Sequence, residues 1–142
     1  MLKINNSYSN TALAANGNYA GGLIGYLYNT HGKLYLSNSY AAGQLTGGIN
    51  YKGGLIGYAE DSGGNSYLSN SFWDKSMSGV TNAIGYAALN QPINNLTGLT
   101  TSETLQQASY TGWDVSNVLN SNSIWYINEN ISTPTLRSFI NH

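Results

Sequence analysis

Residues 19–26 read YAGGLIGY, and residues 51–58 read YKGGLIGY. The same glycine-framed phrase thus occurs twice. A fixed offset of about 32 residues between copies is typical of a repeat protein, in which each copy marks the same place in successive structural units. Shifting the sequence against itself by this offset matches many further positions without a gap. The aligned triads include Ile4/Leu36/Leu68, Asn6/Asn38/Asn70, Tyr8/Tyr40/Phe72 and Leu13/Leu45/Met77.

The repeat starts near residue 2, continues near residue 34 and begins a third copy near residue 66, which decays. Short stretches with period-two alternation, such as KLYLSNSY at residues 33–40, are separated by glycine-rich turns. Helix signals are missing from residues 1–80. These features predict an all-β protein, a right-handed parallel β-helix (β-solenoid) whose units stack about 4.8 Å apart. A β-sandwich with coincidental repetition is the alternative.

Such a fold places equivalent residues of successive units above one another. It predicts an aliphatic stack of Ile4, Leu36 and Leu68 and a matching aromatic stack. The aligned asparagines either form a ladder of amide hydrogen bonds or merely favour turns. The glycines of GGLIG have two expected roles: positive φ where the chain changes direction, and close approach of backbone.

Composition narrows the class of protein. Charged residues make up 8% of the chain, against roughly 25% in ordinary soluble domains. The net charge is -1 and there is no basic run, so nothing favours nucleic acid or an anionic membrane as a partner. No apolar run reaches the roughly 18 residues of a membrane span, so we expect no membrane insertion. Few charges, no cysteine and a start without a signal peptide predict a fragment of a longer exported protein, secreted or on a bacterial cell surface.

The repeated phrase also resembles a known motif. GGLIG at residues 21–25 and 53–57 resembles the GLUG motif, and the segments from NSFWD (70–74) to PTLR (134–137) follow in a similar order. The chain is similar in this to the GLUG-motif repeat region of bacterial filamentous-haemagglutinin-like and autotransporter-type secreted adhesins. GLUG repeats also occur outside the catalytic part of some surface-anchored IgA peptidases. Residues 81–95 are longer than the pattern requires. The resemblance implies a secreted, often adhesive β-helix module and no catalytic residue.

We expect a single domain over residues 1–142, with GLUG-type repeats in 1–80 and degenerate coils and a C-terminal cap in 81–142. Thr100 and Glu103 form a predicted capping box that starts a short helix. The last coil of a solenoid needs cover, and aromatic side chains suit that role. The three tryptophans fall where the repeat ends: Trp73, Trp113 and Trp125. A tryptophan-lined sugar site is the alternative reading of this segment.

Residues with catalytic chemistry are sparse. The six acids are Glu60, Asp61, Asp74, Glu103, Asp114 and Glu129. Glycosidases need two converging carboxylates, whereas these acids are spread along the chain, and we interpret them as turn, cap or solvated surface residues. With no cysteine and only His31 and His142, a transition-metal site is not expected. The sequence predicts no catalytic residue, no metal and no cofactor.

One surface feature predicts binding. Because Leu34 and Leu36 should face inward, Tyr35 should face outward, and Tyr67 should lie directly above it. Two stacked tyrosines would form a rigid amphipathic strip for sugar rings or another protein, although tyrosine also favours sheets wherever it sits. The predicted partner is a host-cell or bacterial surface protein or glycan. The predicted function is a non-catalytic structural and adhesive module, with a carbohydrate-binding or polysaccharide-degrading β-helix module as the alternative.

Overall fold

The structure is a computed structural model that describes residues 1–140, and it is mostly strand (46%) with little helix, which confirms the all-β class. Residues 141–142, the end of the expected domain, lie outside the described residues. The first repeat holds β1 (Leu2–Asn5), β2 (Tyr8–Ser9), β3 (Leu13–Ala15), β4 (Tyr19–Gly21) and β5 (Ile24–Asn29). The second holds β6 (Lys33–Ser37), β7 (Tyr40–Ala41), β8 (Leu45–Gly47), β9 (Tyr51–Gly53) and β10 (Ile56–Asp61).

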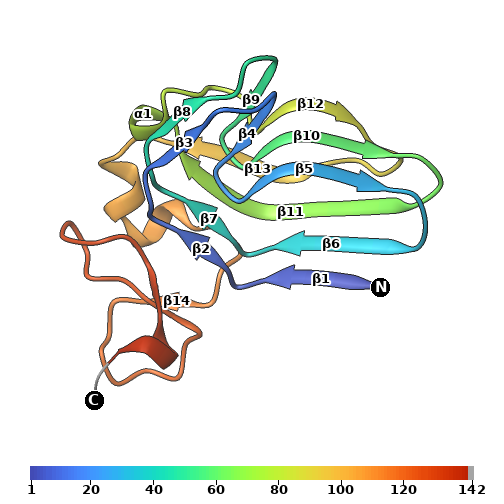
Figure 1. Cartoon of the computed structure of the whole chain (residues 1–142). Coiled ribbons are helices and arrows are strands. Elements are labelled where there is room, and N and C mark those ends of the chain that lie inside the picture. The colour runs from blue at the N-terminus through green and yellow to red at the C-terminus, as the bar shows by residue number, and fades with distance from the viewer. Residues whose placement is uncertain (141–142) are drawn as a thin grey trace.

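The rest of the chain is less regular (Figure 1). Its strands are β11 (Asn65–Asp74), β12 (Ile84–Ala88), β13 (Asn94–Leu99), β14 (Val115–Ser116), β15 (Trp125–Tyr126) and β16 (Thr135–Leu136). Its helices are α1 (Lys75–Ser78) and the 3-10 turns η1 (Glu103–Leu105), η2 (Gln107–Ser109) and η3 (Arg137–Phe139).

Each strand of the first repeat pairs in parallel with its equivalent in the second. The register equals the sequence offset: Ile4 lies opposite Leu36, which lies opposite Leu68 in β11. The predicted aliphatic stack is thereby confirmed. Leu36 is fully buried at its centre, and burial of such a side chain is worth about 1.5–3 kcal/mol.

The third repeat is shorter but keeps the parallel pairing. In β12 the offset is smaller than in the first two repeats, since Ile84 lies opposite Ile56. In β13 it is smaller again, since Asn94 lies opposite Ser69. The segment 81–95 therefore holds β12 and the start of β13. The third repeat is therefore shorter than the first two, and the strands still pair in parallel.

The glycines of GGLIG serve close packing. None of those in residues 21–25 or 53–57 has a positive φ, so the expected role in left-handed turns is wrong. A Cβ on Gly22 would lie 2.4 Å from the carbonyl oxygen of Gly54, and one on Gly54 would lie 2.2 Å from Cδ1 of Trp73. The second expected role, close approach, is confirmed, and an indole ring occupies the space that a side chain would need.

The aligned asparagines share a left-handed backbone: Asn6 and Asn38 lie at bends between strands, and Asn70 lies within β11. Asn6, Asn38 and Asn70 have φ values of 50°, 49° and 43°, in the left-handed region that asparagine tolerates. The Asn38 amide bonds Asn5, 3.3 Å away, rather than Asn6. Of the two alternatives, the ladder among these three side chains does not form, and the turn role fits Asn6 and Asn38 but not Asn70, which lies inside a strand.

A ladder exists one residue further on, made by serines. The backbone N–H of Ser7 donates to Ser39 Oγ at 3.2 Å, and that of Ser39 donates to Ser71 Oγ at 3.3 Å. Each of these two hydroxyls donates in turn to the carbonyl two residues before it, at 2.9 Å. Ser39 and Ser71 are fully buried. The SNS segments thus link successive repeats through hydroxyl groups.

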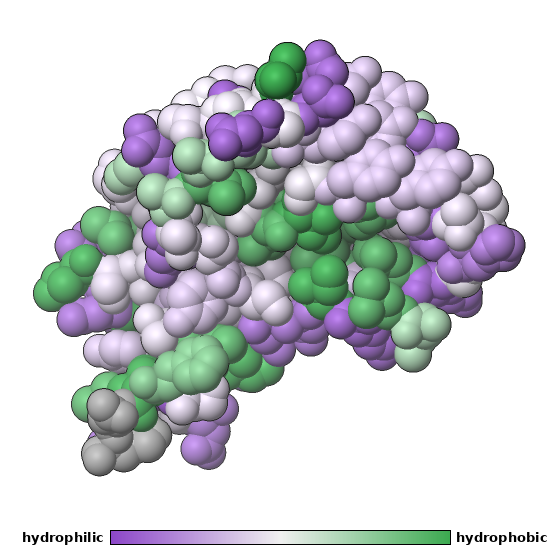
Figure 2. Space-filling model, in the orientation of Figure 1, coloured by the Kyte–Doolittle hydropathy of each residue, from purple (hydrophilic) through white to green (hydrophobic). Residues whose placement is uncertain are grey.

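The first repeat leaves apolar residues open to solvent. Leu2 and Leu13 are 55% and 42% exposed, whereas their equivalents Leu34 and Leu45 are 9% and 4% exposed. Figure 2 shows a hydrophobic patch in the middle of this face, in the region between β1 and β5 of Figure 1. The difference follows from position, because the second repeat is covered on both sides and the first on one.

A one-turn helix, α1, follows β11 and was not expected. Asp74, taken from the sequence as a turn or cap residue, accepts a hydrogen bond from the Met77 backbone at 2.7 Å and so caps the helix. Met77 is 48% exposed and does not align with Leu45 as expected. Val80 packs against Leu45 instead.

The C-terminal third covers the aromatic stack from the side. Tyr8, Tyr40 and Phe72 are in register, as predicted. Trp113 contacts Phe72, while Trp125 contacts both Tyr8 and Tyr40. The two tryptophans together therefore contact aromatic residues of all three repeats. The predicted burial of the tryptophans is confirmed, but the cap lies along the flank of the repeats rather than over their end (Figure 1).

The predicted capping box is confirmed. The Thr100 backbone donates to Glu103 Oε2 at 2.7 Å, and the Glu103 backbone donates to Thr100 Oγ1 at 3.2 Å. The helix that it starts is only the 3-10 turn η1, followed by η2.

Candidate functional site

The predicted pair of tyrosines is stacked on the outside of the sheet. Tyr35 and Tyr67 are in register in β6 and β11, with ring centroids 4.8 Å apart and an interplanar angle of 11°. Both are half-buried, while Leu34 and Leu36 beside Tyr35 are buried. Their predicted stacking is confirmed, and their role in binding stays a prediction.

The two rings have different surroundings. The Lys3 ammonium lies 5.9 Å from the centroid of the Tyr35 ring. Tyr35 borders a cavity of about 350 Å³ that Lys3 also lines, whereas Tyr67 borders a separate cavity of about 370 Å³, called here the Tyr67 cavity. Its lining residues are Tyr67, Leu68, Ser69, Gln91, Pro92 and Asn94.

A larger group of tyrosines lies elsewhere on the surface and was not predicted. This tyrosine cluster consists of Tyr19, Tyr26, Tyr28, Tyr51, Tyr58 and Tyr86. One column runs from Tyr26 through Tyr58 to Tyr86, with centroid distances of 5.2 and 4.6 Å. Tyr19 and Tyr51 stack beside it, 5.9 Å apart with an interplanar angle of 8°.

The repeated phrase itself builds this cluster. Its first tyrosine lies in β4 or β9 and its last in β5 or β10, and the glycine segment between them brings the two strands together. The centroids of Tyr19 and Tyr26 are 5.0 Å apart, and those of Tyr51 and Tyr58 are 5.5 Å apart. The signal in the sequence was a tyrosine at each end of a phrase of constant length. Period-two alternation within one strand could not reveal a contact across a turn.

Three rings of the tyrosine cluster are exposed and the other three are half-buried. Tyr26, Tyr28 and Tyr86 are 51%, 48% and 39% exposed. The Tyr58 hydroxyl donates to the Glu60 carboxylate, and this hydrogen bond raises the pKa of Tyr58 above its ordinary value. Desolvation raises the pKa of Tyr26 in the same direction. The surface therefore presents ring edges and neutral hydroxyls, with Glu60 at its border.

Each acidic side chain accepts a hydrogen bond from another residue of the protein. Glu60 is held by Tyr58, and the other five accept hydrogen bonds from backbone N–H groups. Asp74 is only 2% exposed and also accepts from the Thr101 hydroxyl at 3.0 Å. The turn and cap roles are thus supported, and Glu103 and Asp114 are also exposed at the surface. Within residues 1–140, no group of three or more His, Cys, Asp or Glu side chains could hold a metal ion.

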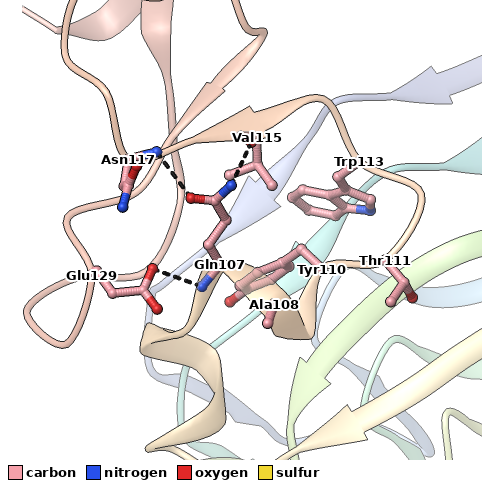
Figure 3. Close-up of a pocket in the computed structure, with 8 residues that line it drawn as sticks. All are labelled: Gln107, Ala108, Tyr110, Thr111, Trp113, Val115, Asn117 and Glu129. Atoms are coloured by element: carbon pink, nitrogen blue, oxygen red, sulfur yellow. Dashed lines mark hydrogen bonds between the residues drawn. The ribbon is translucent and has the colours of Figure 1, made fainter.

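A larger cavity, of about 590 Å³, lies beside Trp113 (Figure 3). Gln107 crosses it: its backbone donates to Glu129 Oε2 at 3.0 Å, and its side-chain amide is bound to backbone groups of the following segment. Trp113 is 9% exposed and stacks on Trp125 with centroids 4.7 Å apart. Its ring faces are covered, so the alternative of a tryptophan-lined sugar site lacks a free ring face here.

Comparisons with known proteins return no match: no family model fits the chain, and neither curated proteins nor solved structures match it. Within residues 1–140, the helices are all too short to cross a lipid bilayer. The resemblance to GLUG-motif adhesins therefore remains a prediction, and the function must be argued from the residues and their geometry.

Proposed function

We propose that the chain is a right-handed parallel β-helix that serves as a non-catalytic structural and adhesive module of a bacterial secreted or cell-surface protein. The fold part of this proposal is supported by the parallel register, which keeps the offset of the sequence repeat in every strand pair of the first two repeats. The exposed first repeat also supports it, because a stack of units leaves apolar residues open at its end.

The adhesive part is carried by one observation, the tyrosine cluster. Six tyrosines from three repeats gather on one outer face, where burial of a core would not require them. Tyrosine supplies large, rigid contact area at low entropic cost and is enriched in protein interfaces. Rings that are already stacked lose still less freedom when a partner binds. The partner is a host-cell or bacterial surface protein or glycan.

The proposal is tested with protein-coated beads on cultured epithelial cells and on bacterial cells. Tyr26, Tyr58 and Tyr86 are replaced together by Ser, which removes the exposed column and leaves the core clusters in place. The matched control is Ile131→Ser, a change at a 72% exposed apolar residue outside the cluster. Wild-type and control beads should adhere, and the triple variant, with an unchanged melting temperature, should lose most of its adhesion. Wild-type beads that adhere no better than albumin-coated beads would contradict the proposal.

The alternative function is a carbohydrate-binding or polysaccharide-degrading module. The Tyr67 cavity favours carbohydrate binding. That site is independent of the tyrosine cluster, and it gives the adhesive module a candidate ligand class.

A further inference from the structure

We propose that the Tyr67 cavity binds one uncharged hexopyranose ring of a glycan. This inference rests on the proposed function for its biological meaning and names a ligand class for it. It is carried by the aromatic ring, the polar groups, the charge and the size of the cavity.

The half-buried ring of Tyr67 borders the cavity. One of its faces is covered by Tyr35, with 4.8 Å between the ring centroids. Because β11 pairs with β6 on one side and with β13 on the other, the uncovered face is directed toward the β13 side. Gln91, Pro92 and Asn94 line the cavity there. The ring is therefore supported from behind and open in front, as a stacking platform requires.

Polar groups surround this ring face. The Gln91 amide nitrogen donates to Asn65 Oδ1 at 2.8 Å, which fixes the side chain. Among residues 1–140, the Gln91 amide oxygen and the Asn94 amide have no hydrogen-bond partner. With the Ser69 hydroxyl they supply both donors and acceptors. A pyranose ring has the complementary chemistry, an apolar face of C–H groups and a rim of hydroxyls.

Charge and size restrict the ligand further. None of the residues that line the cavity is charged, so nothing there would pair with a carboxylate, sulfate or phosphate group. A volume of about 370 Å³ lies at the lower end of the range for small-molecule sites and suits a single ring. Tyr35 borders a cavity of similar size, about 350 Å³, but that cavity is lined by Lys3 and therefore carries a charge.

The test is saturation-transfer NMR with the methyl glycosides of glucose, galactose, mannose and N-acetylglucosamine. At least one should receive transfer, strongest at the C–H protons of one ring face. Tyr67→Ala should weaken its association about tenfold, equivalent to about 1.4 kcal/mol. Tyr67→Phe keeps the ring and should retain binding within about threefold. Tyr28→Ala, the matched control at a 48% exposed tyrosine outside the cavity, should change the affinity less than about threefold.

A second pair of variants covers the case in which Tyr67→Ala unfolds. Gln91→Ala and Asn94→Ala change partly or fully exposed side chains outside the stacked pair, and together they should weaken binding about tenfold. The inference is overturned if no glycoside receives transfer. It is equally overturned if transfer survives in both Tyr67→Ala and the double amide variant, or if adenosine binds and the glycosides do not.

The outcomes also separate this inference from the proposed function. Adhesion that depends on Tyr26, Tyr58 and Tyr86, with no glycoside binding, would leave the adhesive module standing and remove the Tyr67 site. Glycoside binding at Tyr67 with no bead adhesion would establish the site and contradict the adhesive function.

Discussion

Buried serine hydroxyls join the repeats at the scale of single residues. Ser71 Oγ accepts the backbone N–H of Ser39, which is fully buried. A buried donor that loses its acceptor costs about 1–3 kcal/mol. Ser71→Ala should therefore lower the free energy of unfolding by that amount in urea titrations.

The control for this prediction is Ser7→Ala. The Ser7 hydroxyl only donates to the Asn5 carbonyl at an exposed site, so its loss should change stability by less than about 0.5 kcal/mol. Equal effects of the two substitutions would show that the serine ladder contributes nothing specific.

Gly54 makes the second residue-scale prediction. Its missing Cβ leaves room for the Trp73 indole, which is 4% exposed and fixed by a 2.7 Å hydrogen bond to the Val80 carbonyl. Because the ring cannot move aside, Gly54→Ala should cost about 1–3 kcal/mol through overpacking. Gly17→Ala is the control, since no atom lies within 4 Å of its added Cβ and its φ is not positive. A Gly54 variant as stable as the Gly17 variant would contradict the close-packing role of the repeated phrase.

The C-terminal segment acts at the scale of elements by packing β14 and β15 against the aromatic stack. Trp125 is 1% exposed, and its loss would leave a large cavity between Tyr8, Tyr40 and Trp113. Trp125→Ala should lower the free energy of unfolding by about 3–5 kcal/mol. That is a large share of an ordinary total of about 5–15 kcal/mol.

The neighbouring Ile124 provides the comparison for this tryptophan. It is 44% exposed, so Ile124→Ala should leave the melting temperature nearly unchanged. If Trp125→Ala melts like wild type, the C-terminal segment does not stabilise the repeats from the side.

Asp61 links three elements and predicts a pH dependence. It ends β10 and accepts hydrogen bonds from Ser66 in β11 and from the Asn90 backbone after β12. Burial alone would raise the pKa of Asp61, but these hydrogen bonds outweigh it and hold the pKa below its ordinary value of about 3.9. A lowered pKa contributes stability above the unfolded-state value, and that stability is lost as pH falls through the folded-state value.

Wild-type stability should thus decrease on acidification below about pH 4, and Asp61→Asn should flatten this decrease because the amide does not titrate. Urea midpoints on both sides of the ordinary aspartate pKa measure the slope. The same slope in wild type and variant would exclude Asp61 as a source of the acid sensitivity.

The sequence predicted these elements unevenly, for physical reasons. Gapless repetition specified the partners of Leu36 and Tyr35, because strands in register must align equivalent residues. The flank position of Trp125 could not be predicted, since the contact with Tyr8 joins residues far apart in a region without repeats. Helix α1 was missed because one capped turn gives too short a pattern. The tyrosine cluster was missed because its contacts cross a turn within each repeat.

At the scale of the whole molecule, parallel stacking of the repeats orders both the interior and the surface, with one offset in the first two repeats and a shorter one in the third. The register of the repeat stacks leucines inside and tyrosines outside, so the proposed β-helix and the proposed contact surface depend on the same geometry. An alternative fold such as a β-sandwich would give no reason for tyrosines one repeat apart to touch.

Tyrosine-to-tyrosine NOEs measure this geometry most directly. In protein with protonated tyrosine rings in a deuterated background, ring cross-peaks should join Tyr35 with Tyr67 and Tyr26 with Tyr58, whose centroids are 4.8 and 5.2 Å apart. A third should join Tyr58 with Tyr86, at 4.6 Å. Single Tyr→Phe variants assign each peak. Stacked repeats predict all three cross-peaks, and a well-folded protein that lacks them would contradict both the stacked repeats and the tyrosine surface.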